Sequence, residues 1–123
     1  ESEKGAAIFV RACVEFVRMA EAARILYREG LAERAVAALA PSRYLFETLE
    51  ATAKRTHERT GGSLADIERC RRAKEHVEVV IRRIRQYGDR SLGYLPAWEV
   101  LTHPKFMPHD QGCWWIVNAW GNQ

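Results

Sequence analysis

The chain has 123 residues, of which 47% are hydrophobic and 28% charged, and its formal net charge is +3. This length fits one domain, and this composition excludes a disordered tail. Because no run of about 18 apolar residues occurs, we expect no contact with a membrane. The three cysteines, Cys13, Cys70 and Cys113, are odd in number and far apart, which does not indicate a disulfide framework. We therefore expect a reducing compartment, the cytoplasm.

The character of the sequence changes near Gly88. Residues 6–87 are rich in Ala, Arg and Glu and have helical periodicity, whereas residues 88–123 contain three of the four prolines and all four tryptophans. We expect residues 1–88 to form the body of a helical bundle. Residues 89–123 are then a C-terminal capping segment of the same domain.

Glycine and proline divide the body into helices. The first helix is expected over residues 6–29, where apolar positions cover about half of its circumference, and Gly30 follows as a C-terminal cap. So wide an apolar face is typical of a central helix. A short second helix, residues 31–40, is ended by Pro41. Ser42 is the expected N-cap of a third helix over residues 43–59.

The fourth helix follows the stop signal Gly61-Gly62. It opens at a capping-box pattern, Ser63 to Asp66, and runs to about Tyr87. Its expected core-facing seam repeats every three and four residues and is interrupted by Lys74; it comprises Ile67, Cys70, Val77, Ile81 and Ile84. Beyond Gly88, Pro96 can open a short helix through Leu101. Residues 113–120 fit either a strand or a buried helical turn.

The fold class that follows is all-α. We expect a small antiparallel helical bundle of about four helices, with an irregular Trp/Pro-rich C-terminal segment packed on it.

A basic face on the fourth helix is the first candidate site. Four side chains fall within about 60° of one another, on the side away from the seam, at 100° per residue. They are Arg69, Arg72, His76 and Arg83. Such a row of cations can follow the phosphates of a nucleic acid. The alternative is the solvated back of an amphipathic helix, since glutamates dilute the charge and no aromatic residues for base stacking are interleaved.

The tryptophans are the second candidate. Trp98, Trp114, Trp115 and Trp120 bring large buried area and indole donors that need partners. Trp114 and Trp115 are adjacent and cannot both point to the same side, so one of them can anchor a protein partner. The alternative is that all four form a satellite core that closes one end of the bundle.

A metal site is the third candidate. His103, His109 and Cys113 are residue types that bind zinc, and Asp110 is a candidate fourth ligand. Their spacing matches no common zinc signature. Cys113 with one of the histidines can also form a thiol–imidazole pair.

No catalytic motif is present, because the sequence has no Gly-rich phosphate loop, GxSxG or HExxH. We therefore predict a non-catalytic helical protein-interaction or regulatory domain that can self-associate, with a protein partner or a second copy and no cofactor. A nucleic-acid-binding accessory protein is the first alternative. A small metal- or thiol-dependent enzyme is the second, and zinc is its expected cofactor.

Overall fold

A computed structural model describes residues 2–61, 64–89, 91, 93–103 and 120, with side chains described from Arg11 onwards and Ala65 excepted. All regular elements in these ranges are helices: α1 (Ser2–Arg28), α2 (Ala32–Leu39), α3 (Pro41–Thr60), α4 (Leu64–Tyr87) and α5 (Trp98–Thr102). The all-α bundle expected from the sequence is confirmed. None of the described helices has the length and apolar character needed to cross a bilayer.

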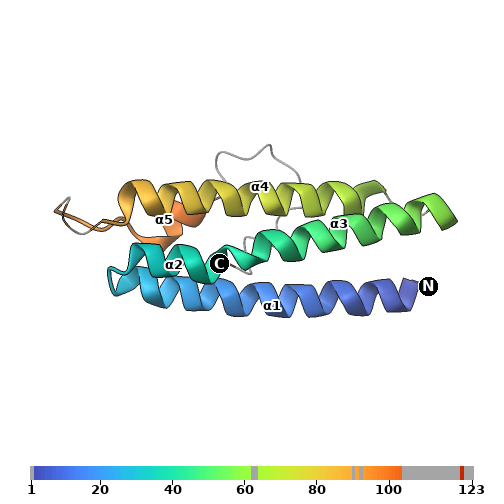
Figure 1. Cartoon of the computed structure of the whole chain (residues 1–123), viewed down its shortest axis with the longest axis horizontal. Coiled ribbons are helices and arrows are strands. Elements are labelled where there is room, and N and C mark those ends of the chain that lie inside the picture. Colours follow the sequence, from blue (N-terminus) through green and yellow to red (C-terminus); the bar gives the residue numbers. More distant parts are fainter. Residues whose placement is uncertain (1, 62–63, 90, 92, 104–119, 121–123) are drawn as a thin grey trace.

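The long helices lie side by side along one axis, and neighbouring helices run antiparallel (Figure 1). α1 runs in one direction, α2 and α3 return one after the other, and α4 runs alongside them in the direction of α1. α5 lies at the end of the bundle where α4 finishes and where α1 turns into α2. The expected reversal between the second and third helices is therefore absent, because α2 and α3 lie in line.

Pro41 explains this continuity. It occupies the first position of α3, where its missing N–H needs no partner. Ala40, which joins the two helices, keeps helical dihedrals of φ −53° and ψ −38°. The expected N-cap role of Ser42 is wrong. Ser42 lies inside α3 and is fully buried, and its hydroxyl donates to the Leu39 carbonyl at 2.6 Å.

The chain does reverse at two glycines with left-handed backbone. Gly30 has φ 81° and ends α1, with its N–H donating to the Tyr27 carbonyl at 2.9 Å. Gly61 has φ 70° and ends α3, with its N–H donating to the His57 carbonyl at 2.8 Å. Both stops were expected, since glycine adopts this conformation without strain.

The core is concentrated toward one end of the bundle. The predicted seam of α4 is confirmed, because all five of its apolar residues are buried and Lys74 is half-exposed, where it pairs with Glu47. The largest fully buried side chains lie on α1 from its middle onwards, on α2, the first half of α3, the C-terminal half of α4 and α5, and at Trp120. They include Phe16, Tyr27, Leu39, Phe46, Ile84, Trp98, Leu101 and Trp120.

α3 contributes little to this core beyond its first half. Its buried residues end at Leu49. In the remaining half, a row of threonine hydroxyls bonds back to the carbonyl four residues earlier: Thr52 to Thr48 at 3.0 Å, Thr56 to Thr52 at 3.0 Å and Thr60 to Thr56 at 2.8 Å. Such bonds satisfy the hydroxyls locally and add no contact with another helix.

Candidate functional site

An aromatic cluster joins the C-terminal segment to the bundle. The indole of Trp120 packs edge-on against Phe16 of α1, with ring centroids 4.9 Å apart and planes at 88°. It also contacts Trp98 at 5.8 Å, and Trp98 in turn contacts Tyr27 at 5.5 Å. Trp98 and Trp120 are each only 2% exposed. Trp98 and Trp120 thus belong to the main hydrophobic core, whereas Trp114 and Trp115 lie outside the described residues.

Both buried indoles have hydrogen-bond acceptors. Trp120 donates from Nε1 to Nδ1 of His76 on α4 at 3.1 Å. Trp98 donates from Nε1 to the backbone carbonyl of Trp120 at 3.3 Å. Since a buried donor without a partner costs about 1–3 kcal/mol, these two bonds make the burial of the tryptophans favourable.

His76 is held in one neutral tautomer by this contact. Its Nδ1 accepts a hydrogen bond from the indole N–H, so the single ring proton must reside on Nε2. Nε2 is buried and forms no hydrogen bond within the described part of the chain. Burial lowers the pKa of His76 to about 4, and the positive charge of Arg83 acts in the same direction, while the backbone of Thr102 opposes the shift.

Arg83 fastens the end of α5 to α4. Its Nη1 donates to the Leu101 carbonyl at 2.7 Å and to the His103 carbonyl at 3.2 Å. These carbonyls lie at the C-terminal end of a helix, where no intrahelical partner exists. The Thr102 hydroxyl donates to the Trp98 carbonyl at 2.9 Å and is fully buried.

The predicted basic face of α4 is therefore not one exposed surface. The expectation that His76 points to solvent is wrong, because its side chain is fully buried. Arg69 pairs with Asp66 at 3.1 Å and Arg72 pairs with Glu68 at 3.2 Å, so acids on the same helix offset both charges. Arg83 is directed at the α5 carbonyls.

Only one of the predicted zinc ligands lies among the described residues. His103 is described and exposed, whereas His109 and Cys113 lie outside the described residues. Within the described ranges, no three His, Cys, Asp or Glu side chains are grouped closely enough to hold a metal ion.

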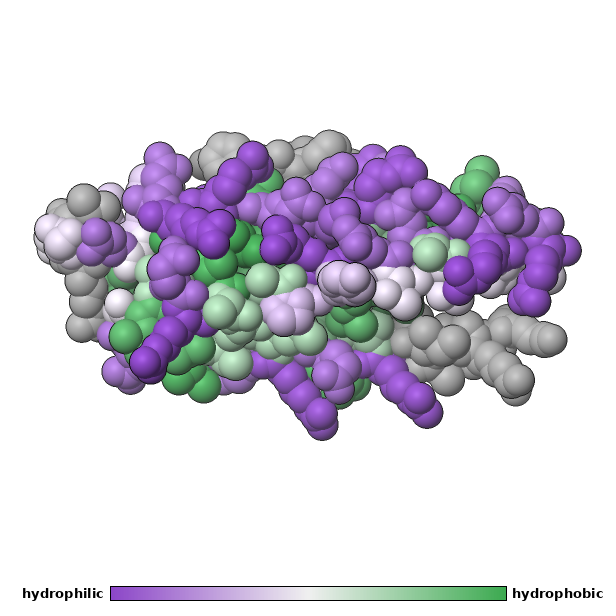
Figure 2. All heavy atoms as spheres, viewed as in Figure 1, coloured by the Kyte–Doolittle hydropathy of each residue, from purple (hydrophilic) through white to green (hydrophobic). Residues whose placement is uncertain are grey.

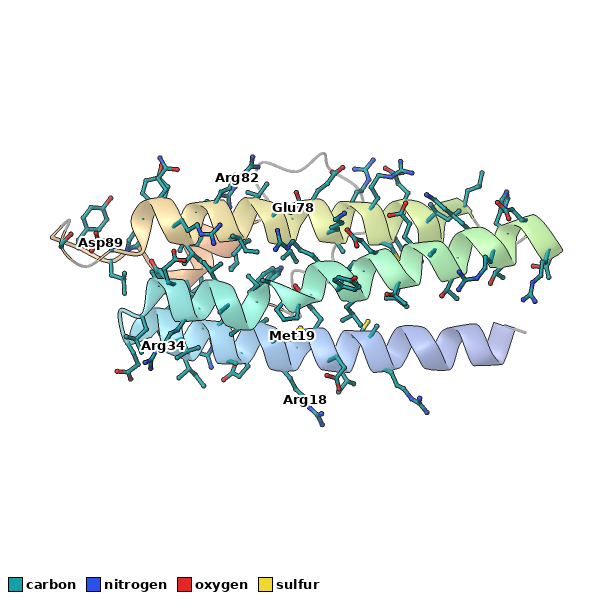
Figure 3. All side chains as sticks on the ribbon, viewed as in Figure 1. Arg18, Met19, Arg34, Glu78, Arg82 and Asp89 are labelled. Atoms are coloured by element: carbon teal, nitrogen blue, oxygen red, sulfur yellow. The ribbon has the colours of Figure 1, made fainter. Side chains whose placement is uncertain are left out.

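A second feature is the outer face of α1, which the sequence indicated only as an apolar face covering about half of the first helix. We use this name for Val14, Val17, Arg18, Glu21 and Ile25. The three aliphatic residues are 45%, 44% and 51% exposed. Figure 3 shows Arg18 projecting from α1 away from the other helices.

The apolar surface is unevenly distributed on the molecule. Figure 2 shows apolar residues, in green, gathered over α2 and the adjoining part of α1, whereas hydrophilic residues cover most of α4 in this view. A protein partner would therefore find apolar contact on the α1 side of the bundle.

Comparison of the chain with protein-family models, with curated proteins and with solved structures finds no match.

Proposed function

We propose that this protein is a non-catalytic interaction domain that self-associates through the outer face of α1. The observation that carries the proposal is the half-exposure of Val14, Val17 and Ile25 on a helix whose opposite side already fills the core. Together with Arg18 and Glu21, which lie between them, the three aliphatic residues form a strip along one side of the helix, since residues three, four and seven apart lie above one another. Covering such a strip with a partner removes apolar area from water.

A second copy of the chain fits this strip because its charges are self-complementary. The charged residues along this side alternate in sign: Glu15, Arg18, Glu21 and Arg24. If a second α1 lies antiparallel, with a two-fold axis midway between Met19 and Ala20, Arg18 faces Glu21 of the partner subunit. The same arrangement sets Val14 against Ile25 of the partner subunit. A parallel arrangement would instead oppose like charges at Arg18 and at Glu21.

Two ion pairs already exist on α1: Glu21 accepts hydrogen bonds from Arg24 and would share its carboxylate with Arg18 of the partner subunit, whereas the pair between Arg18 and Glu15 is weak. Arg18 lies 3.5 Å from Glu15, and both side chains are more than half exposed, so the pair is worth little and can exchange partners. At each end of the contact Arg11 would face Arg28 of the partner subunit. Glu99 of the same chain as that arginine lies 3.5 Å from its guanidinium and offsets the charge.

The strip predicts weak association. From Val14 to Ile25 it spans three helical turns, about 17 Å at 1.5 Å per residue. A stable dimer usually buries about 800 Å² per subunit, more than one side of a three-turn helix offers. The dimer should therefore form at high protein concentration and dissociate on dilution.

Sedimentation velocity over a concentration series tests the proposal. The wild type should shift from monomer to dimer, and the Val14→Ser/Ile25→Ser double variant should remain monomeric throughout. Val100→Ser is the matched control, because Val100 is 62% exposed but lies on α5. A wild type that stays monomeric at the highest concentration, or a double variant that dimerises like the wild type, contradicts the proposal.

Charge reversal tests the antiparallel arrangement separately. Arg18→Glu should weaken the dimer, and Arg18→Glu/Glu21→Arg should restore it, because the two reversed charges again face each other across the axis. If Arg18→Glu and Arg18→Glu/Glu21→Arg weaken the dimer equally, the two copies associate in another register.

The proposed location is the reducing cytoplasm. Support comes from Cys13 and Cys70, which are free thiols rather than partners in a disulfide.

A further inference from the structure

The buried contact between His76 and Trp120 differs from the rest of the core, because it depends on a group that titrates. Trp120 enters the cluster through ring contacts with Phe16, Trp98 and His76, and through one side-chain hydrogen bond to His76 Nδ1. We propose that His76 is a pH-sensitive latch that holds Trp120 in the core and releases it when the imidazole gains a proton.

The hydrogen bond has the wrong polarity for a protonated ring. Neutral His76 accepts at Nδ1 from the indole N–H at 3.1 Å. In the imidazolium both ring nitrogens carry protons and can only donate. Two donors would then face each other between two buried side chains, and both the hydrogen bond and the T-shaped ring contact at 5.5 Å would be disrupted.

The surroundings offer little compensation for the new charge, since only the backbone of Thr102 favours the protonated ring, and burial and Arg83 outweigh it. On α4, Arg83 acts on His76 as a cation, and Arg72 lies one turn earlier and pairs with Glu68. The segment after α5 contributes His103, a second group whose positive charge opposes protonation. The ring that α1 adds to the Trp120 site is that of Phe16, which is uncharged. Among the described groups that act on its pKa, none is a carboxylate.

Release concerns the Trp120 side chain alone: its backbone carbonyl, which accepts the Trp98 Nε1–H at 3.3 Å, should stay in place, and so should Trp98. Its helix is fastened independently, since Arg83 binds the carbonyls at the end of α5 and Leu101 is buried beside it. Trp98 also keeps its ring contact with Tyr27 of α1. The latch therefore predicts selective release of Trp120 rather than loss of the whole cluster.

The direction of the pH effect follows from the two protonation states. With Trp120 in place, burial and Arg83 hold the pKa of His76 at about 4. With Trp120 released, the pKa should move toward the ordinary value of about 6.5. Between these values the released form binds the proton more tightly. The ratio of held to released Trp120 should therefore fall as the pH falls, by up to about two orders of magnitude.

Indole N–H signals in ¹⁵N NMR spectra can follow this release. The readout is the exchange protection of Trp120 Nε1–H relative to Trp98 Nε1–H in the same sample, from pH 8 to pH 4, with far-UV circular dichroism monitoring the helices. Trp120→Phe assigns the signal. In the wild type, Trp120 should lose protection while Trp98 keeps it. If both lose protection together at one pH, the latch is refuted.

Two histidine variants complete the test. The side-chain oxygen of His76→Gln can accept the indole proton but cannot titrate, so the relative protection of Trp120 should become independent of pH. His103→Gln is the matched control and should respond like the wild type. If His76→Gln responds like the wild type, His76 is not the latch. If His76→Gln does not fold, the wild-type comparison of Trp120 with Trp98 decides alone.

Discussion

Gly88 directly follows α4 and approaches the corner between α1 and α2 closely. A Cβ atom placed there would overlap the backbone carbonyl oxygen of Ile84, and it would lie 3.1 Å from the Ala32 Cβ and 3.3 Å from the Tyr27 Cε1. The carbonyl of Ile84 cannot simply turn away, because it accepts the Gly88 N–H at 2.7 Å. Gly88→Ala should therefore force the last turn of α4 away from α1.

The cost can be worked out from these contacts. Overfilling a packed site costs about 1–3 kcal/mol, and loss of the last backbone hydrogen bond adds about 1 kcal/mol. Unfolded alanine has less conformational entropy than unfolded glycine, so the substitution regains about 0.4–1 kcal/mol of the free energy of unfolding. We expect Gly88→Ala to lower the free energy of unfolding by about 2 kcal/mol. For a chain of this length that loss corresponds to a decrease in Tm of about 8 °C.

Gly61→Ala is the matched control for Gly88→Ala. Gly61 has φ +70°, and no heavy atom lies within 4 Å of an added Cβ, so the substitution tests backbone strain without a clash. That strain should cost about 1–2 kcal/mol. Urea unfolding followed by circular dichroism compares the two variants at equal m-values. If Gly88→Ala costs less than Gly61→Ala, the close approach at Gly88 does not limit the packing.

Three further outcomes follow from the contacts and pKa values. Tyr27→Phe removes the hydroxyl that donates to the Pro96 carbonyl, so urea unfolding should show a loss of about 1 kcal/mol in the free energy of unfolding. Tyr94→Phe is the control and should show no measurable loss, because the Tyr94 side chain is 69% exposed. Burial raises the pKa of Cys70 to about 12. A thiol reagent at pH 8 should therefore label half-buried Cys13 before Cys70. Earlier labelling of Cys70 would contradict this burial. Stability should fall as the pH drops from about 6.5 to about 4, because unfolded His76 takes up a proton that the folded form with Trp120 in place excludes. The loss in urea titrations should be at most about 3 kcal/mol, and His76→Gln should remove this share of it.

The sequence predicted the fold well where backbone chemistry determines it. Gly30 and Gly61 end helices because they adopt left-handed dihedrals, and the Ile67 to Ile84 seam of α4 is buried as its spacing predicts. Pro41 misled the prediction, since proline ends a helix but also fits the first position of the next one. Nothing in the sequence near Pro41 distinguishes a reversal from a continuation, which depends on how the two helices pack on α1 and α4.

The candidate site was harder to predict because α4 is covered on two sides. Its seam packs on the other long helices, while Val80 and His76, next to the seam, are covered where α5 and Trp120 pack. The buried part of the circumference of α4 is therefore wider than its seam alone. The signal for it in the sequence was the pair Val79 and Val80, which flank the basic face on the side away from the seam. The hydrogen bond joins residues 44 positions apart, and helical periodicity carries no information about such a pair.

The concentration of the core at one end of the bundle has a consequence for how the molecule opens. The second half of α3 has no buried residue beyond Leu49, and its threonine hydroxyls bond only to their own helix. Local unfolding free energy should therefore rise along the bundle, from near zero at Thr60 toward the global value around Phe16 and Trp98. The chain should then open in stages from the Thr60 end, which makes this end the first place for a protease to cut and the last part to become ordered during folding.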